Sequence, residues 1–512
     1  MSKIIKLLVC LNIVFFVGYS SKILAQSGFE VVQAKDVEIF TEASSYSANV
    51  LVHGGFDLHY KSKRLTLFGQ GIDDYAKQRF HIDFESIVFA DTTFFLRLAN
   101  RGGSFKERLT SPYYQDNNEA DITSSGASIF AKQFYLEYRH NPLVKLIYGR
   151  QEAFIGDKIG LVYRGDLNAI TQACTVGSWC YYIGISEISE HQSSGIDFVH
   201  INYPIYDQEE TVADLWLDGI SKNRLEVEVY IVRYRDAKVA LAKYGGAADL
   251  PNYNNHADSI YSPDQVRDSQ KSLIFNDLNL QYAGINVSWQ SYPFIVNTHY
   301  VSMAGKSKEH KQAANNSDDF TFIKEITRTG YAWSLDGSWR FMPEHKFNFG
   351  MLLASGNKPE DYAGYKDTYD SNNTTQTNDV AFYEIKKGTF GDANIYFNHF
   401  EGFGLGHSVS NLTFAQVGYS YKKDIDSFGY DLNIYNFSRT NGEYNKSGSF
   451  VKNIGIEVDN DITFTLSQNL FLKLSASVFI PKEAYSESDN IIPEDTPPDT
   501  YINLDAHLKY SF

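Results

Sequence analysis

The sequence predicts an all-β fold, a transmembrane antiparallel β-barrel of about 18 strands with long extracellular loops and short periplasmic turns. Three observations predict it: a two-residue alternation of apolar and polar side chains, a high aromatic content, and no second long apolar run. Aromatic residues make up 15% of the 512 residues, with 36 Tyr and 36 Phe. After the amino-terminal run, no apolar stretch approaches the roughly 20 residues that a membrane helix needs.

The alternation is clearest at the carboxyl end. From Tyr501 to Phe512 every second residue is apolar or small, and the residues between them are polar. Side chains alternate across a strand, so one face of such a strand is apolar and the other polar. A half-buried edge strand of a soluble sandwich is the alternative reading of this segment alone. The same period recurs over 225–231, 331–341 and 470–480.

Charged residues occupy the polar positions of many of these segments. An unpaired charge in a dry core costs several kcal/mol. A water-filled lumen removes that cost, and this favours a channel-like barrel over a sandwich.

The amino terminus carries a secretory signal. Lys3 and Lys6 precede an apolar run from Leu7 to Val17, and Ala25 offers a cleavage point; the run is too short for a membrane helix. We therefore expect residues 1–25 to be a signal peptide, 26–49 a periplasmic segment or first strand, and 50–512 the barrel. The expected location is the outer membrane of a Gram-negative-type bacterium.

Connections of alternating length set the orientation. Short links are expected at 466–469, 422–427, 386–388 and 342–344, and long links at 481–500, 438–450, 401–410, 355–378 and 303–328. This asymmetry is typical of outer-membrane barrels and places the carboxyl end in the periplasm. Further outer loops are expected at 101–128, 152–193 and 236–277. The link 204–222 falls on the periplasmic side although it is long. Residues 209–216 within it could form a short helix, but a plain long turn is the favoured interpretation.

The charge balance bears on partners. The formal net charge is −16, and removal of the expected signal makes it more negative, which argues against a nucleic-acid partner. The expected partners are outer-membrane lipid and lipopolysaccharide, the barrel-assembly machinery through the carboxyl-terminal strand ending in Phe512, and a small or polymeric solute.

No credible catalytic set appears. The chain lacks a glycine-rich phosphate loop and a serine in the strand–turn–helix context of a nucleophile elbow. We expect no enzyme activity, no cofactor and no metal. Cys174 and Cys180 survive processing and lie close in sequence, so a disulfide closing a short loop is expected in an oxidising compartment. Two unpaired loop thiols are the alternative.

The informative residues are charges expected on the inner face. They could form a cationic ladder that draws an anionic solute through the pore. Acids on the same face could instead pair with these cations across neighbouring strands and stiffen the wall. The predicted pore-lining residues are Arg97, Lys132, Arg139, Arg150, Arg224, Arg340, Lys346, Glu137, Asp336 and Asp459.

Two segments resemble the alginate-export family of outer-membrane porins. The first is Gly149-Arg150-Gln151 with the later Arg164-Gly165-Asp166; the second runs from Gly455 to Asp459 and through Asn469-Leu470 to Pro481. The resemblance implies a monomeric 18-stranded barrel whose arginines, Arg150 among them, attract an anionic uronate polymer. The many inward acids depart from that picture.

The resulting functional prediction is a passive outer-membrane channel, with an anionic sugar or uronate polymer as the solute that the ladder and the resemblance imply. A nonspecific diffusion porin and a barrel that acts as an adhesin or surface receptor through its loops are the alternatives.

Overall fold

The computed structural model describes the barrel and part of its connections. The described residues are 50–65, 73–89, 91–100, 103–104, 129–141, 143–155, 161–176, 179–187, 194–211, 220–236, 273–312, 320–356, 378–383, 385, 393–396, 409–423, 428–444, 447, 449–467, 469–485 and 500–511. The expected signal peptide and the segment 26–49 lie outside them, as does Phe512.

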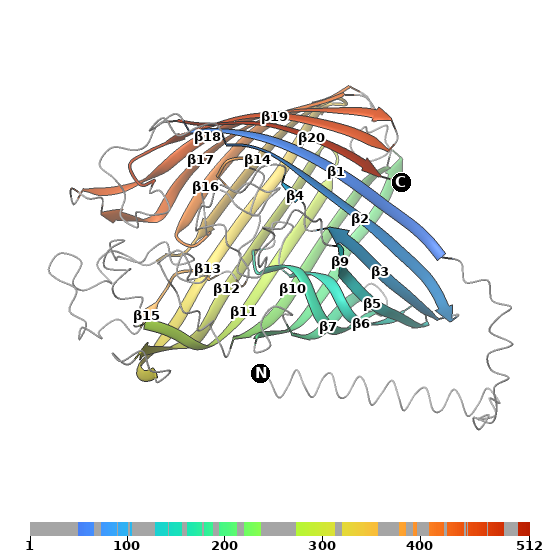
Figure 1. Ribbon diagram of the computed structural model, residues 1–512, viewed down its shortest axis with the longest axis horizontal. Coiled ribbons are helices and arrows are strands. Elements are labelled where there is room, and N and C mark those ends of the chain that lie inside the picture. The colour runs from blue at the N-terminus through green and yellow to red at the C-terminus, as the bar shows by residue number, and fades with distance from the viewer. Residues whose placement is uncertain are drawn as a thin grey trace.

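One closed antiparallel barrel of 18 long strands forms the body of the molecule (Figure 1). The first half consists of β1 (Val50–Leu65), β2 (Asp73–Phe89), β3 (Thr92–Asn100), β5 (Ile129–Asn141), β6 (Val144–Ile155), β7 (Tyr163–Val176), β8 (Trp179–Glu187), β9 (Ser194–Thr211) and β10 (Ile220–Asp236). The second half consists of β11 (Leu273–Ser291), β12 (Phe294–Gln312), β13 (Phe320–Met342), β14 (His345–Ala354), β16 (Leu412–Lys422), β17 (Phe428–Tyr444), β18 (Phe450–Ser467), β19 (Leu470–Pro481) and β20 (Tyr501–Ser511).

The barrel closes between its first and last strands. β1 pairs with β20 from Gly55↔Ser511 to Leu65↔Tyr501. Two short pieces join the same sheet: β4 (Gly103–Ser104) pairs with β2, and β15 (Asn378–Asp379) pairs parallel to β13. No helix in the described part is long and apolar enough to cross a bilayer.

The two ends of the barrel differ. Tight connections such as Ser291 to Phe294 and Met342 to His345 lie at one end, which we call the turn end. The carboxyl end lies there too, because Ser511 N donates to the carbonyl of Asn469 in the β18–β19 turn. The long links lie at the opposite end, the loop end. The predicted asymmetry of connections is therefore present.

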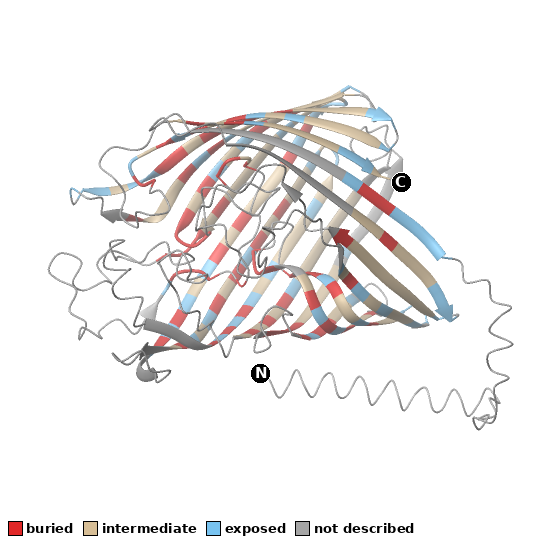
Figure 2. Cartoon of the chain, in the orientation of Figure 1, coloured by how far each residue is buried: buried red, intermediate tan, exposed pale blue. Residues whose placement is uncertain are grey.

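The wall has an apolar outer face and a polar inner face, as the alternation predicts. On β13, Tyr331, Trp339 and Phe341 are exposed, whereas Ser334 and Arg340 on the other alternation are buried. Figure 2 shows this alternation of buried and exposed positions along the strands. The outer apolar run from Tyr331 to Phe341 spans about 33 Å of strand, or about 23 Å of height at a tilt near 45°.

A row of aromatic side chains encircles part of the outer face near the turn end. Consecutive ring centroids lie 5.1–6.4 Å apart from β11 to β18. The members are Trp289, Phe294, Trp339, Phe341, His345, Tyr421, Phe428 and Phe464. Rings at this height match the aromatic girdles of membrane barrels.

Two predictions about connections are wrong. Residues 163–187 hold β7 and β8 instead of an outer loop, and no wall strand separates β14 from β16, because these two strands pair directly. Residues 209–211 belong to β9, and the rest of the segment 209–216 lies outside the described residues. The predicted turn at 386–388 itself lies outside the described residues, and the described residues on its two sides, 380–383 and 393–396, are irregular. The strand number agrees with the prediction since the two missed strands replace the two that were expected around 386–388.

Candidate functional site

The inner wall toward the turn end carries charges that are largely paired. Six ion pairs join side chains on one strand or on neighbouring strands, with N–O distances of 2.5–3.3 Å. They are Arg97–Asp83, Arg139–Glu137, Lys145–Glu137, His200–Glu228, Arg224–Glu226 and Lys473–Asp461. The alternative in which acids pair with cations along and across strands therefore describes this wall better than a continuous cationic ladder.

Most of the predicted site residues share the inner alternation of their strands. These are Arg97, Glu137, Arg139, Arg224, Asp336, Arg340, Lys346 and Asp459. They form separate groups around the wall: Arg340 pairs in register with Lys346, and Asp336 accepts from Asn297 Nδ2 (2.8 Å). Their role in lining a conducting pore stays a prediction.

Two predicted residues have a different place. Lys132 is the extra residue of a β-bulge, because Arg97 pairs with Gln133 and Leu98 with Ala131. Arg150 lies where β6 stops pairing with β5, and its Nε donates to the backbone carbonyl of Lys132 (2.8 Å). Its described contact is therefore with the wall itself.

The predicted disulfide is wrong. Cys174 and Cys180 form no disulfide; Cys174 is buried and Cys180 is exposed. The segment between them is a tight β7–β8 connection in which Cys174 pairs with Tyr181 and Cys180 with Thr175. Adjacent residues of a strand face opposite sides, so the two thiols lie on opposite faces of the sheet. Among the described residues no group of three or more His, Cys, Asp and Glu is placed to hold a metal ion.

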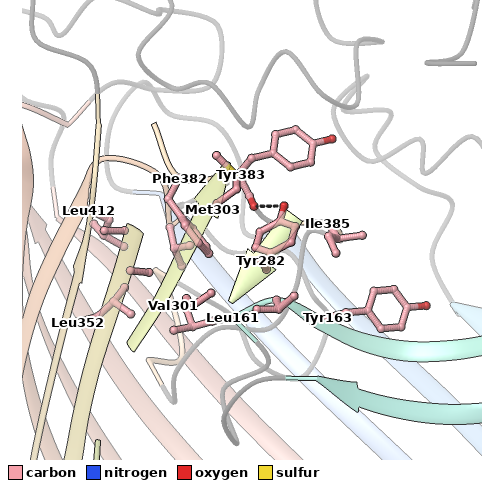
Figure 3. Packing of buried hydrophobic residues seen from close by; sticks show 14 of the residues in the cluster. Leu161, Tyr163, Tyr282, Val301, Met303, Leu352, Phe382, Tyr383, Ile385 and Leu412 are labelled. Atoms are coloured by element: carbon pink, nitrogen blue, oxygen red, sulfur yellow. Dashed lines mark hydrogen bonds between the residues drawn. The ribbon is translucent and has the colours of Figure 1, made fainter. Parts of the chain in front are cut away.

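Toward the loop end the lumen is filled by apolar side chains. We call this contiguous set the lumen cluster; it draws on β6, β7, β9 to β14 and β16 to β20. Tyr282, Val301 and Leu352 project into it from the wall, all at most 1% exposed. Figure 3 shows them packed with Phe382 and Leu161, which come from chain that has left the wall.

The link between β14 and β16 supplies one filling element. We call its described residues, 378–383, 385, 393–396 and 409–411, the lumen segment. Phe382 N donates to the carbonyl of Ser355 (3.0 Å), and the Tyr282 hydroxyl donates to the carbonyl of Tyr383 (2.8 Å; Figure 3). Phe382 is fully buried. The lumen segment thus crosses from the end of β14 to the inner face of β11.

Carboxylates of β18 hold the far part of the lumen segment. Glu457 accepts from the backbone N–H groups of Ile395 (2.6 Å) and Tyr396 (2.8 Å), and Asp459 accepts from Asn394 N (3.0 Å). Both carboxylates are at most 1% exposed. The Tyr396 ring also stacks on Phe437 with centroids 4.1 Å apart. These bonds satisfy backbone donors that no sheet ladder reaches.

A second filling element comes from the wall. β6 pairs with β5 only as far as Phe134↔Arg150, and β7 pairs with β8 only as far as Asn168↔Glu187. Beyond these points the two strands pair with each other alone, to Ile155↔Tyr163. We call residues 150–155 and 161–168 the detached hairpin. Leu161 and Tyr163 at its tip belong to the lumen cluster (Figure 3).

Sequence reasoning placed Asp459 on the inner face but missed both filling elements. The apolar run Val380-Ala-Phe-Tyr383 has the composition of a strand, and nothing in it distinguishes a wall strand from chain buried inside the barrel. Gly149 was an available signal for the hairpin, because a glycine within a strand pattern suggests a bulge or close backbone approach.

Comparisons with known proteins concern the fold. Neither a protein-family model nor a curated protein matches the chain. The outer membrane protein OpdK from Pseudomonas aeruginosa is similar with 10% identity and a TM-score of 0.46, covering 91% of this chain and 98% of that chain. OccK8 (OprE) from the same organism is similar with 9% identity and a TM-score of 0.48, covering 91% of this chain and 98% of that chain. A BenF-like porin from Pseudomonas fluorescens Pf-5 is similar with 9% identity and a TM-score of 0.47, covering 91% of this chain and 98% of that chain. Likeness at this identity says nothing about a solute.

Proposed function

We propose that this chain is an outer-membrane channel that passes small hydrophilic solutes down their gradient without chemistry. The observation that carries the proposal is the closed barrel with an apolar outer band and a polar inner wall. The band of about 23 Å on β13 matches the roughly 25 Å apolar band of outer-membrane barrels. Polar Thr327 and Thr329 continue the outer alternation beyond it.

The same band supports the proposed location and partners. Outer-membrane lipid and lipopolysaccharide would cover Tyr331, Trp339 and their neighbours, which are exposed in the isolated chain. The barrel-assembly machinery would engage the strand β20 that ends the wall. Placing Arg at Leu472, which lies on the outer alternation of β19, should cost about 2–4 kcal/mol if it meets mid-bilayer lipid. Ser475→Arg on the inner alternation is the control, and an equal cost at both positions would contradict the assignment of faces.

The two filling elements support passage of small solutes rather than wide diffusion. The lumen segment and the detached hairpin occupy the loop-end half of the lumen with buried side chains. A barrel narrowed in this way leaves a passage set by side chains rather than by strand number.

Conductance of the purified full-length protein in planar lipid bilayers tests the channel proposal. We expect discrete current steps that require insertion of the folded protein. Membranes that contain verified folded, inserted protein and show no steps would contradict a channel and favour the adhesin or surface-receptor alternative.

An anionic uronate polymer remains the second candidate for the solute. The observation that favours it is the register neighbourhood of Arg340 and Lys346, which puts two cations together on the inner wall near the turn end. Under this alternative, uronate oligomers added on the turn-end side should interrupt the current, and a neutral oligosaccharide of equal length should not. Equal effects of the two would remove the polymer candidate.

A further inference from the structure

The detached hairpin has a defined point of departure from the wall. Gly149 has a φ of 130°, a conformation that favours glycine. A Cβ at this position would lie 2.4 Å from the carbonyl oxygen of Phe134 and 2.9 Å from the Cα of Tyr135. β6 can therefore turn away from β5 at this residue because it has no side chain.

Arg150 secures the same fork. Where β6 leaves, the carbonyl of Lys132 on β5 has no ladder partner from β6, since the β5–β6 pairing stops at Phe134 and Arg150. The Nε of Arg150 donates to that carbonyl at 2.8 Å. A second hydrogen bond joins β5 to the hairpin: Gln133 Nε2 donates to Asp166 Oδ1 (2.8 Å).

The two faces of the detached hairpin differ in character. On the odd-numbered face, Gln151, Ala153 and Leu167 are at most 4% exposed, and Ala153 and Leu167 belong to the lumen cluster. On the even-numbered face Glu152 is exposed and Asp166 is half-buried. Exposed polar side chains inside a barrel require water, so the solvent-filled side of the hairpin is its even-numbered face.

That face looks toward the wall made by β2, β3 and β5. Gln133 reaches Asp166 from β5, and Glu152 and Asp166 both act electrostatically on Arg97 of β3. Arg97 itself is engaged by Asp83, with Nε–Oδ1 and Nη2–Oδ2 distances of 2.7 and 2.6 Å. The charge of Arg97 is thus neutralised by Asp83, whereas Glu152 adds negative charge on the exposed side.

We propose that the solute passage runs between the even-numbered face of the detached hairpin and the wall of β2, β3 and β5. In this arrangement Glu152 and Asp166 determine the ion preference of the channel, and Gly149 and Arg150 are positioning residues that hold the hairpin at its distance from the wall. This inference rests on the proposed channel function. It adds the location of the passage and the residues that determine ion selectivity.

Reversal potentials in planar bilayers under a salt gradient test the selecting residues. Carboxylates that line a narrow passage raise the local cation concentration. We expect Glu152→Lys to lower the cation-to-anion permeability ratio by about twofold or more. Asp166→Asn keeps an acceptor for Gln133 and should lower the ratio in the same direction by less.

The matched control is Glu325→Lys, the same change at an exposed position on the outer alternation of β13. It should leave the reversal potential at the wild-type value. A conducting wild-type protein whose ratio is unmoved by Glu152→Lys would overturn the inference and leave the channel function standing. Failure of the wild-type protein to conduct would overturn both.

The positioning role of Arg150 predicts a change in cation preference opposite to the change expected from its charge. Arg150→Met removes a positive charge, which by charge alone would raise cation preference. If Arg150 positions the hairpin, the variant should instead lower cation preference, because Glu152 no longer stands over the passage. Arg150→Lys keeps a donor and should retain a preference closer to wild type. A rise in cation preference for Arg150→Met would overturn the positioning role.

Discussion

The lumen segment and the detached hairpin both fill the barrel, yet different chemistry holds each of them. The lumen segment has lost all ladder pairing over 393–396, and buried carboxylates on β18 accept its backbone N–H groups. The hairpin keeps the ladder between its own strands and leaves the wall at one glycine. Its ties to β5 come from side chains, those of Arg150 and Gln133.

The two kinds of attachment differ in how easily each element can move. Backbone donors buried in the lumen need acceptors whatever passes through the channel, so Glu457 and Asp459 act as fixed structural groups. A hairpin with satisfied backbone bonds can shift by changing a few side-chain contacts. We therefore expect perturbation of the lumen segment to alter the pore grossly, and perturbation of the hairpin to tune it.

The largest effect is expected from Glu457→Leu. The change removes the acceptor of two buried N–H groups, each of which costs about 1–3 kcal/mol when unsatisfied. We expect the lumen segment to leave β18 and the single-channel conductance to increase. Glu228→Leu is the control, since Glu228 is an inner-wall acid whose described contacts are with His200 and Asn286. Unchanged conductance in folded Glu457→Leu protein would show that the segment does not depend on this acceptor.

Gly149→Ala should have the next largest effect. A backbone conformation that L residues rarely adopt costs about 1–3 kcal/mol, and contact with Phe134 and Tyr135 adds to it. Unfolding of the detergent-solubilised barrel, followed by heat-dependent gel mobility, should occur at lower temperature. Gly429→Ala is matched, because a Cβ there meets only ordinary contacts at 3.7 and 3.9 Å. Equal stability of the two variants would contradict the fork geometry.

A smaller effect is expected from Tyr282→Phe. The ring stays in the lumen cluster, and the hydrogen bond from the hydroxyl to the carbonyl of Tyr383 is lost, which is worth about 0.5–1.5 kcal/mol. Tyr300→Phe on the exposed outer face serves as the control. A variant as stable as this control would indicate that the lumen segment does not rest on β11.

No effect is expected from a reducing agent. The turn-end part of β7 and β8 is held by ladder bonds, and Cys174 and Cys180 form no disulfide. Thiol titration of the unfolded, unreduced mature protein should find both thiols, and reductant should leave thermal stability unchanged. Loss of titratable thiols that reductant restores would support the disulfide expected from the sequence.

The wall was predictable from sequence because its environment is periodic. Each strand of a barrel meets apolar surroundings on one side and polar ones on the other, so a run such as 470–480 shows its faces directly. The placement of Arg340 and Asp459 on the inner face follows from that period alone.

The filling elements were not predictable in the same way. Leu161 and Phe382 are buried by residues far away in sequence, and their local pattern carries no period that says so. In the hairpin portion of β7 one face is buried in the lumen cluster and the other is polar and in contact with solvent. The sequence also holds no signal that pairs Glu457 with the backbone of Ile395. A carboxylate that accepts from a backbone N–H does not depend on the side chain of the donor residue.

Site-directed spin labelling along β5 in lipid vesicles tests the central claim most directly. Labels at Phe134 and Leu136 should respond to oxygen, which concentrates in hydrocarbon. Labels at Tyr135, Glu137 and Arg139 should respond to a water-soluble paramagnetic reagent, so that accessibility alternates with a period of two. Equal access of the water-soluble reagent to both sets, or protein that stays dispersed without detergent or lipid, would contradict a membrane barrel with a hydrated lumen.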